Sequence, residues 1–166
     1  ELVEVRKHKG MTIEKARELM DDYNYFGCMY VYKGYADAIG GSCICSTAEL
    51  MKPALQILRE KDSIVSETSI LKDKKNKRIL FGTDFSLNIS PDAEQLSKIA
   101  LNAVKVVRDF DIDPKVAFLS FTTKTPAENP TVKPILEAVK LTKKEQPNLI
   151  IDGEFQIDAA VNPDAA

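Results

Sequence analysis

The chain has 166 residues and a formal net charge of −2, from 23 basic and 25 acidic side chains, and 44% of its residues are hydrophobic. This length is typical of one domain with a buried core, and the balanced charge argues against a nucleic-acid or membrane partner. No apolar run approaches the roughly 20 residues of a membrane-spanning helix, no signal peptide is visible, and three cysteines favour a reducing cytoplasm. Because the sequence begins at Glu1 rather than Met and stops abruptly at Ala166, we expect a piece of a longer polypeptide.

Helical patterns dominate the first third of the chain. The predicted elements are helices over residues 13–22, 25–32 and 47–59, and a strand over residues 35–42 that runs into a glycine loop. Thr12 is a predicted N-cap, and Gly34 a predicted helix end. Ser46 and Glu49 form a capping-box pattern, while Pro53 predicts a kink or a later helix start.

Strands and helices alternate in the rest of the chain. The predicted strands cover residues 64–71, 78–84, 116–120 and 149–152, and the predicted helices cover residues 91–110 and 130–144. Ser90 is the expected N-cap of the first helix, with Pro91 at its first position. The apolar run 116–120 predicts a strand that is covered on both faces. We therefore expect an α/β fold with a mostly parallel sheet flanked by helices, and a possible antiparallel hairpin from residues 64–84.

Ligands of such sheets bind beyond the carboxyl ends of the strands. The three segments expected there are residues 40–47, 120–126 and 152–160. Each of them carries glycines, hydroxyls or carboxylates, and these segments therefore contain the candidate functional residues.

The first two segments suit an anion. Ser46 and Thr47 stand at a predicted helix N-terminus with Lys52 further along, which favours phosphate binding, although a tight turn with an ordinary cap explains the same residues. Thr122 and Thr123 precede Lys124, and these groups would also hold a phosphate; the alternative is a polar loop that ends at a proline.

Other polar residues give weaker signals. Asp152 and Glu154 would orient a substrate or equally satisfy loop backbone. Cys43 and Cys45 fit a pair of small hydrophobic side chains better than a zinc site, so no metal site is predicted. His8 lies in a short basic cluster that reads as solvated surface rather than as a catalytic base.

Six stretches in order along the chain resemble the phosphate acetyl/butyryl transferase family: VEVRKHKGMTIEKA, YFGCMYVYKGYAD, STAELMKPALQIL, PDAEQLSKIALNA, DPKVAFLSFTT and PNLIIDGEFQIDAA. The resemblance implies a cytoplasmic enzyme that moves an acyl group between phosphate and coenzyme A without a covalent acyl-enzyme. It implies small-molecule substrates (coenzyme A, acyl phosphate and phosphate), no tightly bound cofactor, and a homodimer. The implied fold is like that of isocitrate and isopropylmalate dehydrogenases, with two α/β domains and the site in the cleft between them.

The resemblance also implies roles for particular residues. Arg6 matches a family arginine, Thr47 matches a hydroxyl position, and Lys52 matches an arginine that contacts the phosphoryl group. The full set of predicted substrate-binding residues is Arg6, Ser46, Thr47, Lys52, Thr122 and Thr123. No catalytic acid or base is assigned, because the family's catalytic aspartate comes from a segment beyond Ala166, and the isolated chain is expected to show little or no turnover.

The chain departs from the family pattern in both loops. Lys52 replaces a bidentate arginine with a point charge, the usual Ser-Gly reads Gly41-Ser42, and Pro126 removes a backbone donor from the second loop. A catalytically inactive module that binds acyl-CoA for regulation or oligomerisation is therefore the alternative, and a dimerisation domain without a ligand is a third possibility. Residues 1–40 are expected to form rim and linker helices of a first domain, and residues 41–166 a second α/β domain.

Overall fold

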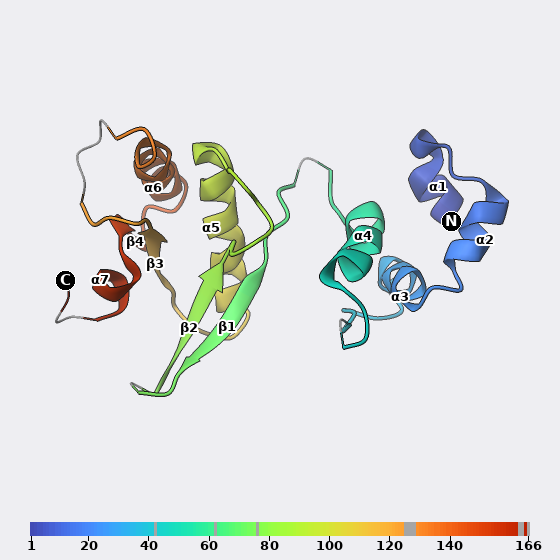
Figure 1. Ribbon diagram of the computed structural model, residues 1–166, viewed down its shortest axis with the longest axis horizontal. Coiled ribbons are helices and arrows are strands. Elements are labelled where there is room, and N and C mark those ends of the chain that lie inside the picture. Colours follow the sequence, from blue (N-terminus) through green and yellow to red (C-terminus); the bar gives the residue numbers. More distant parts are fainter. Residues whose placement is uncertain (42, 62, 76, 125–128, 163–164, 166) are drawn as a thin grey trace. The chain divides into compact units, whose positions relative to one another are not determined.

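The computed structural model describes residues 1–41, 43–61, 63–75, 77–124, 129–162 and 165. The chain divides into two compact units, Glu1–Ser63 and Ile64–Ala166, whose elements are drawn in Figure 1. Each unit has its own apolar core. Within the described residues, no helix combines the length and the apolar character needed to cross a bilayer. The sequence predicted a domain boundary near residue 40, between two domains of a longer enzyme. The division after Ser63 separates compact units within this chain and does not test that boundary, which stays a prediction.

All regular elements in the described part of the first unit are helices. Its elements are α1 (Leu2–Arg6), the 3₁₀ turn η1 (Lys7–Lys9), α2 (Ile13–Leu19), α3 (Tyr23–Tyr32) and α4 (Thr47–Ile57). Thr12 caps α2 as predicted, because its side chain accepts a hydrogen bond from the Lys15 N–H at 3.2 Å. Gly34 follows α3 with φ +71°, a left-handed conformation that glycine adopts without strain.

Six buried residues form the core of this unit: Leu2, Ala16, Tyr25, Cys28, Met29 and Ile57. They come from α1, α2, α3 and α4, so the core joins all four helices. The Tyr25 hydroxyl donates to Gln56 Oε1 at 2.9 Å, which provides a polar partner for the one hydroxyl among these side chains.

Two predictions for this unit are wrong. Residues 35–41 form no strand, and Ser42 lies outside the described residues. The described part of the unit contains no strand with which they could pair, and an extended segment gains little stability alone. Helix α4 begins at Thr47 and runs through the buried Pro53, so the later start at Pro53 is also wrong.

The second unit is α/β. Its elements are β1 (Thr68–Asp73), β2 (Arg78–Thr83), α5 (Ala93–Arg108), β3 (Lys115–Leu119), α6 (Lys133–Glu145), β4 (Ile150–Phe155) and α7 (Ile157–Val161). β1 and β2 form the predicted antiparallel hairpin, and β3 and β4 form a parallel pair joined through α6. The α/β class is confirmed, although the described strands form two separate two-stranded sheets rather than one mostly parallel sheet.

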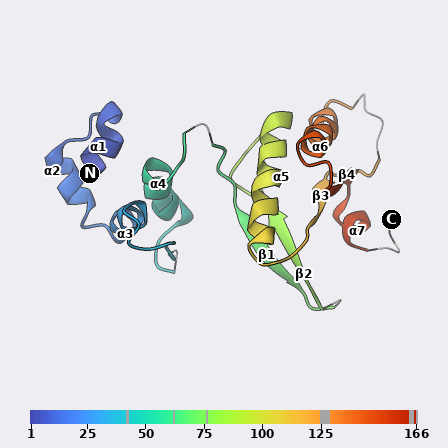
Figure 2. The ribbon, with the colours of Figure 1, turned by 180° about the vertical axis from the view of Figure 1, so that it is seen from behind.

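Helices α5 and α6 lie side by side in both views of the ribbon (Figure 2). The buried cluster that they share with β3 and β4 contains Ala100, Val104, Phe118, Ala138, Val139, Leu149 and Ile151. Thr142 Oγ1 lies 2.7 Å from the Ala138 carbonyl oxygen and 2.9 Å from Ser97 Oγ, and all of these atoms are buried. Because the carbonyl can only accept, the Thr142 hydroxyl donates to it and the Ser97 hydroxyl donates to Thr142.

Details of two elements differ from the sequence prediction. The N-cap of α5 is Asp92 rather than Ser90, since Asp92 and Gln95 form a reciprocal capping box at 2.8 and 2.9 Å. Strand β3 is not covered on both faces: Phe118 is 8% exposed, but Leu119 is 45% exposed. The described part of β3 pairs with β4 alone, and only one face of the pair contacts α6 and the buried cluster.

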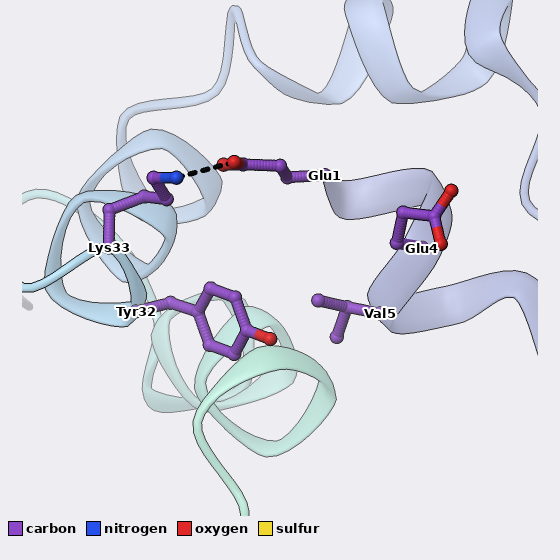
Figure 3. Close-up of a pocket in the computed structure, with 5 residues that line it drawn as sticks. All are labelled: Glu1, Glu4, Val5, Tyr32 and Lys33. Carbon is purple, nitrogen blue, oxygen red and sulfur yellow. Dashed lines mark hydrogen bonds and ion pairs between the residues drawn. The ribbon is translucent and has the colours of Figure 1, made fainter.

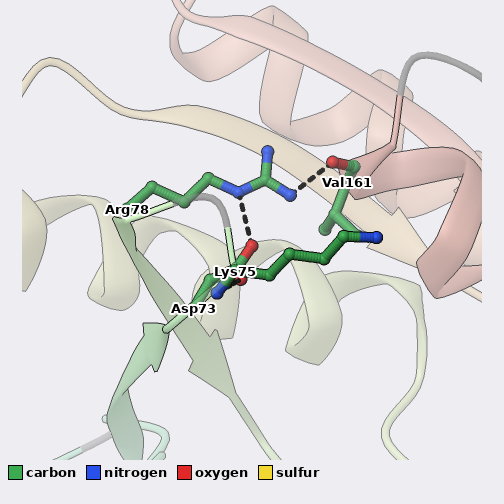
Figure 4. A network of polar contacts seen from close by, with 4 residues as sticks. All are labelled: Asp73, Lys75, Arg78 and Val161. Carbon is green, nitrogen blue, oxygen red and sulfur yellow. Dashed lines mark hydrogen bonds and ion pairs between the residues drawn. The ribbon is translucent and has the colours of Figure 1, made fainter.

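The turn end of the β1–β2 hairpin is linked to the end of α7 (Figure 4). Arg78 Nε donates to Asp73 Oδ2 at 3.0 Å, and a terminal guanidinium nitrogen of Arg78 donates to the Val161 carbonyl oxygen. The Lys75 N–H donates to Asp73 Oδ1 at 3.1 Å. These contacts connect the end of α7 to a turn more than eighty residues earlier in the sequence.

Candidate functional site

The N-terminus of α4 carries two of the predicted substrate-binding residues, Ser46 and Thr47, and Ser46 forms several hydrogen bonds there. The Ser46 N–H donates to Glu49 Oε2 at 2.7 Å, the Ser46 hydroxyl donates to the same oxygen at 2.8 Å, and the Glu49 N–H donates to Ser46 Oγ at 3.3 Å. The backbone hydrogen bond from Ser46, followed by its hydroxyl, lowers the pKa of Glu49. The ordinary-cap alternative therefore describes what Ser46 does in this structure.

Thr47 and Lys52 are both exposed on α4. Five positions separate them, and at 3.6 residues per turn their side chains leave the helix axis about 140° apart. They therefore do not share a face of the helix. Lys52 shares its face instead with Gln56, one turn later.

Arg6 ends α1 and is half-buried. Its Nε is buried and has no hydrogen-bond partner among the described residues. Burial raises the pKa of Tyr25, and the positive charge of Arg6 acts against that rise. Helix α1 packs against α4, where Gln56 accepts the hydrogen bond of Tyr25 one turn after Lys52.

A buried guanidinium N–H without a partner is uncommon, because burial removes the water that would otherwise accept its hydrogen bond. An anionic oxygen would satisfy it with a charge-assisted hydrogen bond. The geometry of Arg6 is therefore suited to binding an anion. Sequence reasoning did not include Tyr25 or Gln56 in this group, although the spacing of Gln56 one turn after Lys52 was a usable signal.

The first unit also contains two surface hollows. One of ≈ 330 Å³ is lined by Glu1, Glu4, Val5, Tyr32 and Lys33, and the Lys33 ammonium pairs with the Glu1 carboxylate across it (Figure 3). The other, of ≈ 570 Å³, is lined mostly by apolar side chains of α1, α2 and α3. None of the predicted substrate-binding residues lines either hollow.

The second unit brings two predicted ligand segments together at the carboxyl ends of β3 and β4, as the sequence predicted. The Ser120 N–H donates to the Phe155 carbonyl oxygen at 2.8 Å, and the Lys124 N–H donates to the Glu154 carbonyl oxygen at 3.3 Å. Residues 125–128, which include Thr125 and Pro126 of the same loop, lie outside the described residues. Residues 40–47, the first of the three predicted segments, follow no strand within the described residues, so their predicted place at a strand end is wrong.

The two threonines of this loop have different hydrogen bonds. The half-buried Thr122 hydroxyl donates to Glu154 Oε1 at 3.2 Å, and Glu154 is fully buried. The exposed Thr123 hydroxyl oxygen accepts from the Gln156 N–H at 2.9 Å. Both residues thus connect the loop to the end of β4.

Lys124, the cation of the loop, is engaged as well. Its Nζ lies 3.0 Å from Asp152 Oδ1, 3.2 Å from the Gly153 carbonyl oxygen and 4.6 Å from the centroid of the Phe155 ring. The hydrogen bond from Lys124 lowers the pKa of Asp152, which favours the charged carboxylate. A phosphate in this loop would have to compete with that carboxylate for Lys124.

Comparison with known proteins identifies the relatives of the chain. The family model that is described as phosphate acetyl/butaryl transferase matches residues 1–166. The phosphate acetyltransferase of Bacillus subtilis is 40% identical over 164 residues, which cover 99% of this chain and 50% of the relative. The phosphate acetyltransferase of Nitratidesulfovibrio vulgaris is 37% identical, over 98% of this chain and 23% of the relative.

Solved structures give the same result. A phosphotransacetylase from Streptococcus pyogenes superimposes with a TM-score of 0.86 at 39% identity, over 98% of this chain and 50% of that one. The EutD phosphotransacetylase from Staphylococcus aureus gives a TM-score of 0.80 at 38% identity, with the same coverage. This chain spans half or less of the length of these relatives. It belongs to the phosphate acetyl/butaryl transferase family.

Proposed function

We propose that the protein containing this chain transfers an acetyl or other short acyl group between acyl phosphate and coenzyme A. The observation that carries the proposal is the family match along residues 1–166. In this reaction the thiol sulfur attacks the carbonyl carbon of the acyl phosphate, the C–O bond to phosphate breaks, and inorganic phosphate leaves as the thioester forms. The thiol proton passes to a base that we do not assign within these residues.

The chemistry requires cations that hold the phosphoryl group. We propose Arg6 as the principal one, because its buried Nε–H lacks a partner among the described residues and a phosphoryl oxygen would supply it. Lys52 adds an exposed positive charge on α4, and Thr47 adds an exposed hydroxyl in the first turn of the same helix. Ser46 supports this turn through its capping box, and Thr122 and Thr123 are proposed to contact substrate from the second unit.

The remaining expectations belong to the same proposal. The longer protein would have two domains with a fold like that of isocitrate and isopropylmalate dehydrogenases, residues 1–40 contributing to the first and residues 41–166 forming the second. It would act as a homodimer in the cytoplasm on coenzyme A, acyl phosphate and phosphate. It would use coenzyme A as a substrate and no tightly bound cofactor.

The test uses the longest natural polypeptide that contains this sequence. Acetyl phosphate and coenzyme A are supplied together, and thioester formation is followed against a sample without enzyme. We expect turnover that Arg6→Gln reduces and that Lys98→Ala, a change at an exposed lysine of α5, leaves unaltered. Binding of coenzyme A without any turnover would refute the transferase and support an acyl-CoA-binding module.

A further inference from the structure

The two neighbouring threonines at the end of β3 present opposite hydrogen-bonding groups to a ligand. Thr122 directs its only hydroxyl proton at the buried Glu154 carboxylate, 3.2 Å away. Thr123 uses an oxygen lone pair to accept the Gln156 N–H at 2.9 Å, and this bond leaves its proton for another acceptor. Thr123 is exposed, whereas Thr122 is half-buried, so Thr123 is the donor that a ligand reaches.

The charges around Thr123 disfavour a phosphate as that ligand. The Lys124 ammonium is held by Asp152 at 3.0 Å and by the Gly153 carbonyl oxygen at 3.2 Å. A phosphate that took Lys124 from Asp152 would leave the carboxylate beside it, and like charges at short range repel. An uncharged oxygen acceptor meets no such repulsion.

The surroundings of Thr123 also include apolar surface. Phe121, two positions before Thr123 in the same loop, is 61% exposed. The half-buried Phe155 precedes Gln156, which bonds to Thr123, and its ring lies under the Lys124 side chain. A hydrogen-bond donor next to exposed aromatic surface suits a ligand in which amide groups alternate with methylene groups. The pantetheine arm of coenzyme A has this composition, whereas acyl phosphate does not.

We propose that Thr123 donates a hydrogen bond to an amide carbonyl of the pantetheine arm of coenzyme A, and that Thr122 with Glu154 positions the loop for it. The identity of this ligand rests on the proposed function. The two threonine positions then serve coenzyme A rather than the phosphoryl group.

Calorimetry on the longest natural polypeptide tests this assignment, with coenzyme A, 3′-phospho-ADP (which lacks the pantetheine arm) and inorganic phosphate as separate probes. Thr123→Val is expected to weaken coenzyme A binding about 5- to 10-fold, the effect of one neutral hydrogen bond, and to leave the other two probes unchanged. Thr123→Ser retains the hydroxyl and should restore binding. Thr131→Val, at an exposed threonine of the same unit, is the matched control.

Several results would overturn the assignment: unchanged coenzyme A affinity in Thr123→Val, an equal loss for 3′-phospho-ADP, a loss for phosphate alone, or no coenzyme A binding by the unaltered protein. Failure of the transferase proposal looks different, because coenzyme A would bind through Thr123 without any thioester being formed from acetyl phosphate.

The positioning role of Thr122 has its own readout. Thr122→Val removes the hydrogen bond to Glu154, so the Lys124 amide, which donates to the Glu154 carbonyl, should exchange its hydrogen faster, while Thr123→Val should change that exchange less. Equal exchange rates in Thr122→Val and the unaltered protein would show that Thr122 does not hold the loop.

Discussion

Replacing Arg6 with glutamine removes the positive charge that the phosphoryl group is proposed to meet. The Arg6 Nε forms no hydrogen bond with the described residues, so the free protein loses little by the change. We expect its free energy of unfolding to fall by about 1 kcal/mol or less, through the lost packing of the half-buried arginine stem. The effect should therefore lie in substrate binding.

The burial of Nε sets the size of that effect. A hydrogen bond between a charged group and its partner contributes about 1.5–3 kcal/mol, and every 1.4 kcal/mol is a factor of ten, so the KM for acyl phosphate should rise about 10- to 100-fold. Lys52 is exposed, and an exposed charge contributes about 0.2–1 kcal/mol, so Lys52→Ala should raise the same KM only about 1.5- to 5-fold. The KM for coenzyme A should change less in both variants.

Initial-rate measurements with each substrate varied in turn give the KM for acyl phosphate and the KM for coenzyme A separately. Arg6→Lys keeps the charge but loses the guanidinium fork, so it should fall between the unaltered protein and Arg6→Gln. Equal increases in the KM for acyl phosphate and for coenzyme A, or a larger effect from Lys52→Ala than from Arg6→Gln, would contradict the assigned role of the buried guanidinium.

Three further changes test the second unit. Thr142→Val should lower the free energy of unfolding by about 1–3 kcal/mol in urea titrations, because the buried Ser97 hydroxyl loses its partner. Adding Ser97→Ala should recover part of that loss. Strictly additive effects of the two substitutions would argue against the hydrogen bond. Lys124→Met should raise the pKa of Asp152 in an NMR titration. Because the folded-state pKa of the Asp152 carboxyl is lowered, the Lys124–Asp152 pair stabilises the fold above about pH 3.9 and loses that effect as the pH falls through the folded pKa. The difference in stability between Lys124→Met and the unaltered protein should therefore vanish in acid. An unaltered Asp152 pKa in Lys124→Met would refute the pairing. Gly153→Ala should lower stability by about 1–3 kcal/mol, because the added Cβ would meet a backbone oxygen of β3 at 3.0 Å, and an unchanged melting temperature would contradict this steric conflict.

Local signals predicted the fold best where the stabilising contacts are themselves local. The capping box of α4 joins Ser46 to Glu49, three residues away, so four positions of sequence contain the whole motif. At α5, Ser90-Pro91 and Asp92 both fit a helix start, and Gln95 decides between them by completing the box with Asp92. Residues 35–42 read as a strand from their own pattern, but a strand depends on a partner that the pattern does not reveal.

The candidate site shows the same limit. Topology alone predicts that the segments after β3 and β4 meet at one edge, and they do. The sequence does not predict which acceptor each hydroxyl bonds, because the acceptor of Thr122 is Glu154, 32 residues away. Likewise the burial of the Arg6 Nε depends on how α1 packs in the core of the first unit, and no spacing in the sequence encodes that packing.

The pairing of β3 with β4 has a consequence for handling the chain in solution. Among the described strands, each of these two pairs on one side only, so each keeps an edge of backbone N–H and C=O groups that no strand covers. Ile150 and Leu119 are 62% and 45% exposed along this pair. Such an edge templates the addition of another extended chain with little regard to its sequence. Self-association of the purified 166-residue chain should therefore grow with its concentration and persist at high salt, because backbone hydrogen bonds rather than surface charges would hold the copies together.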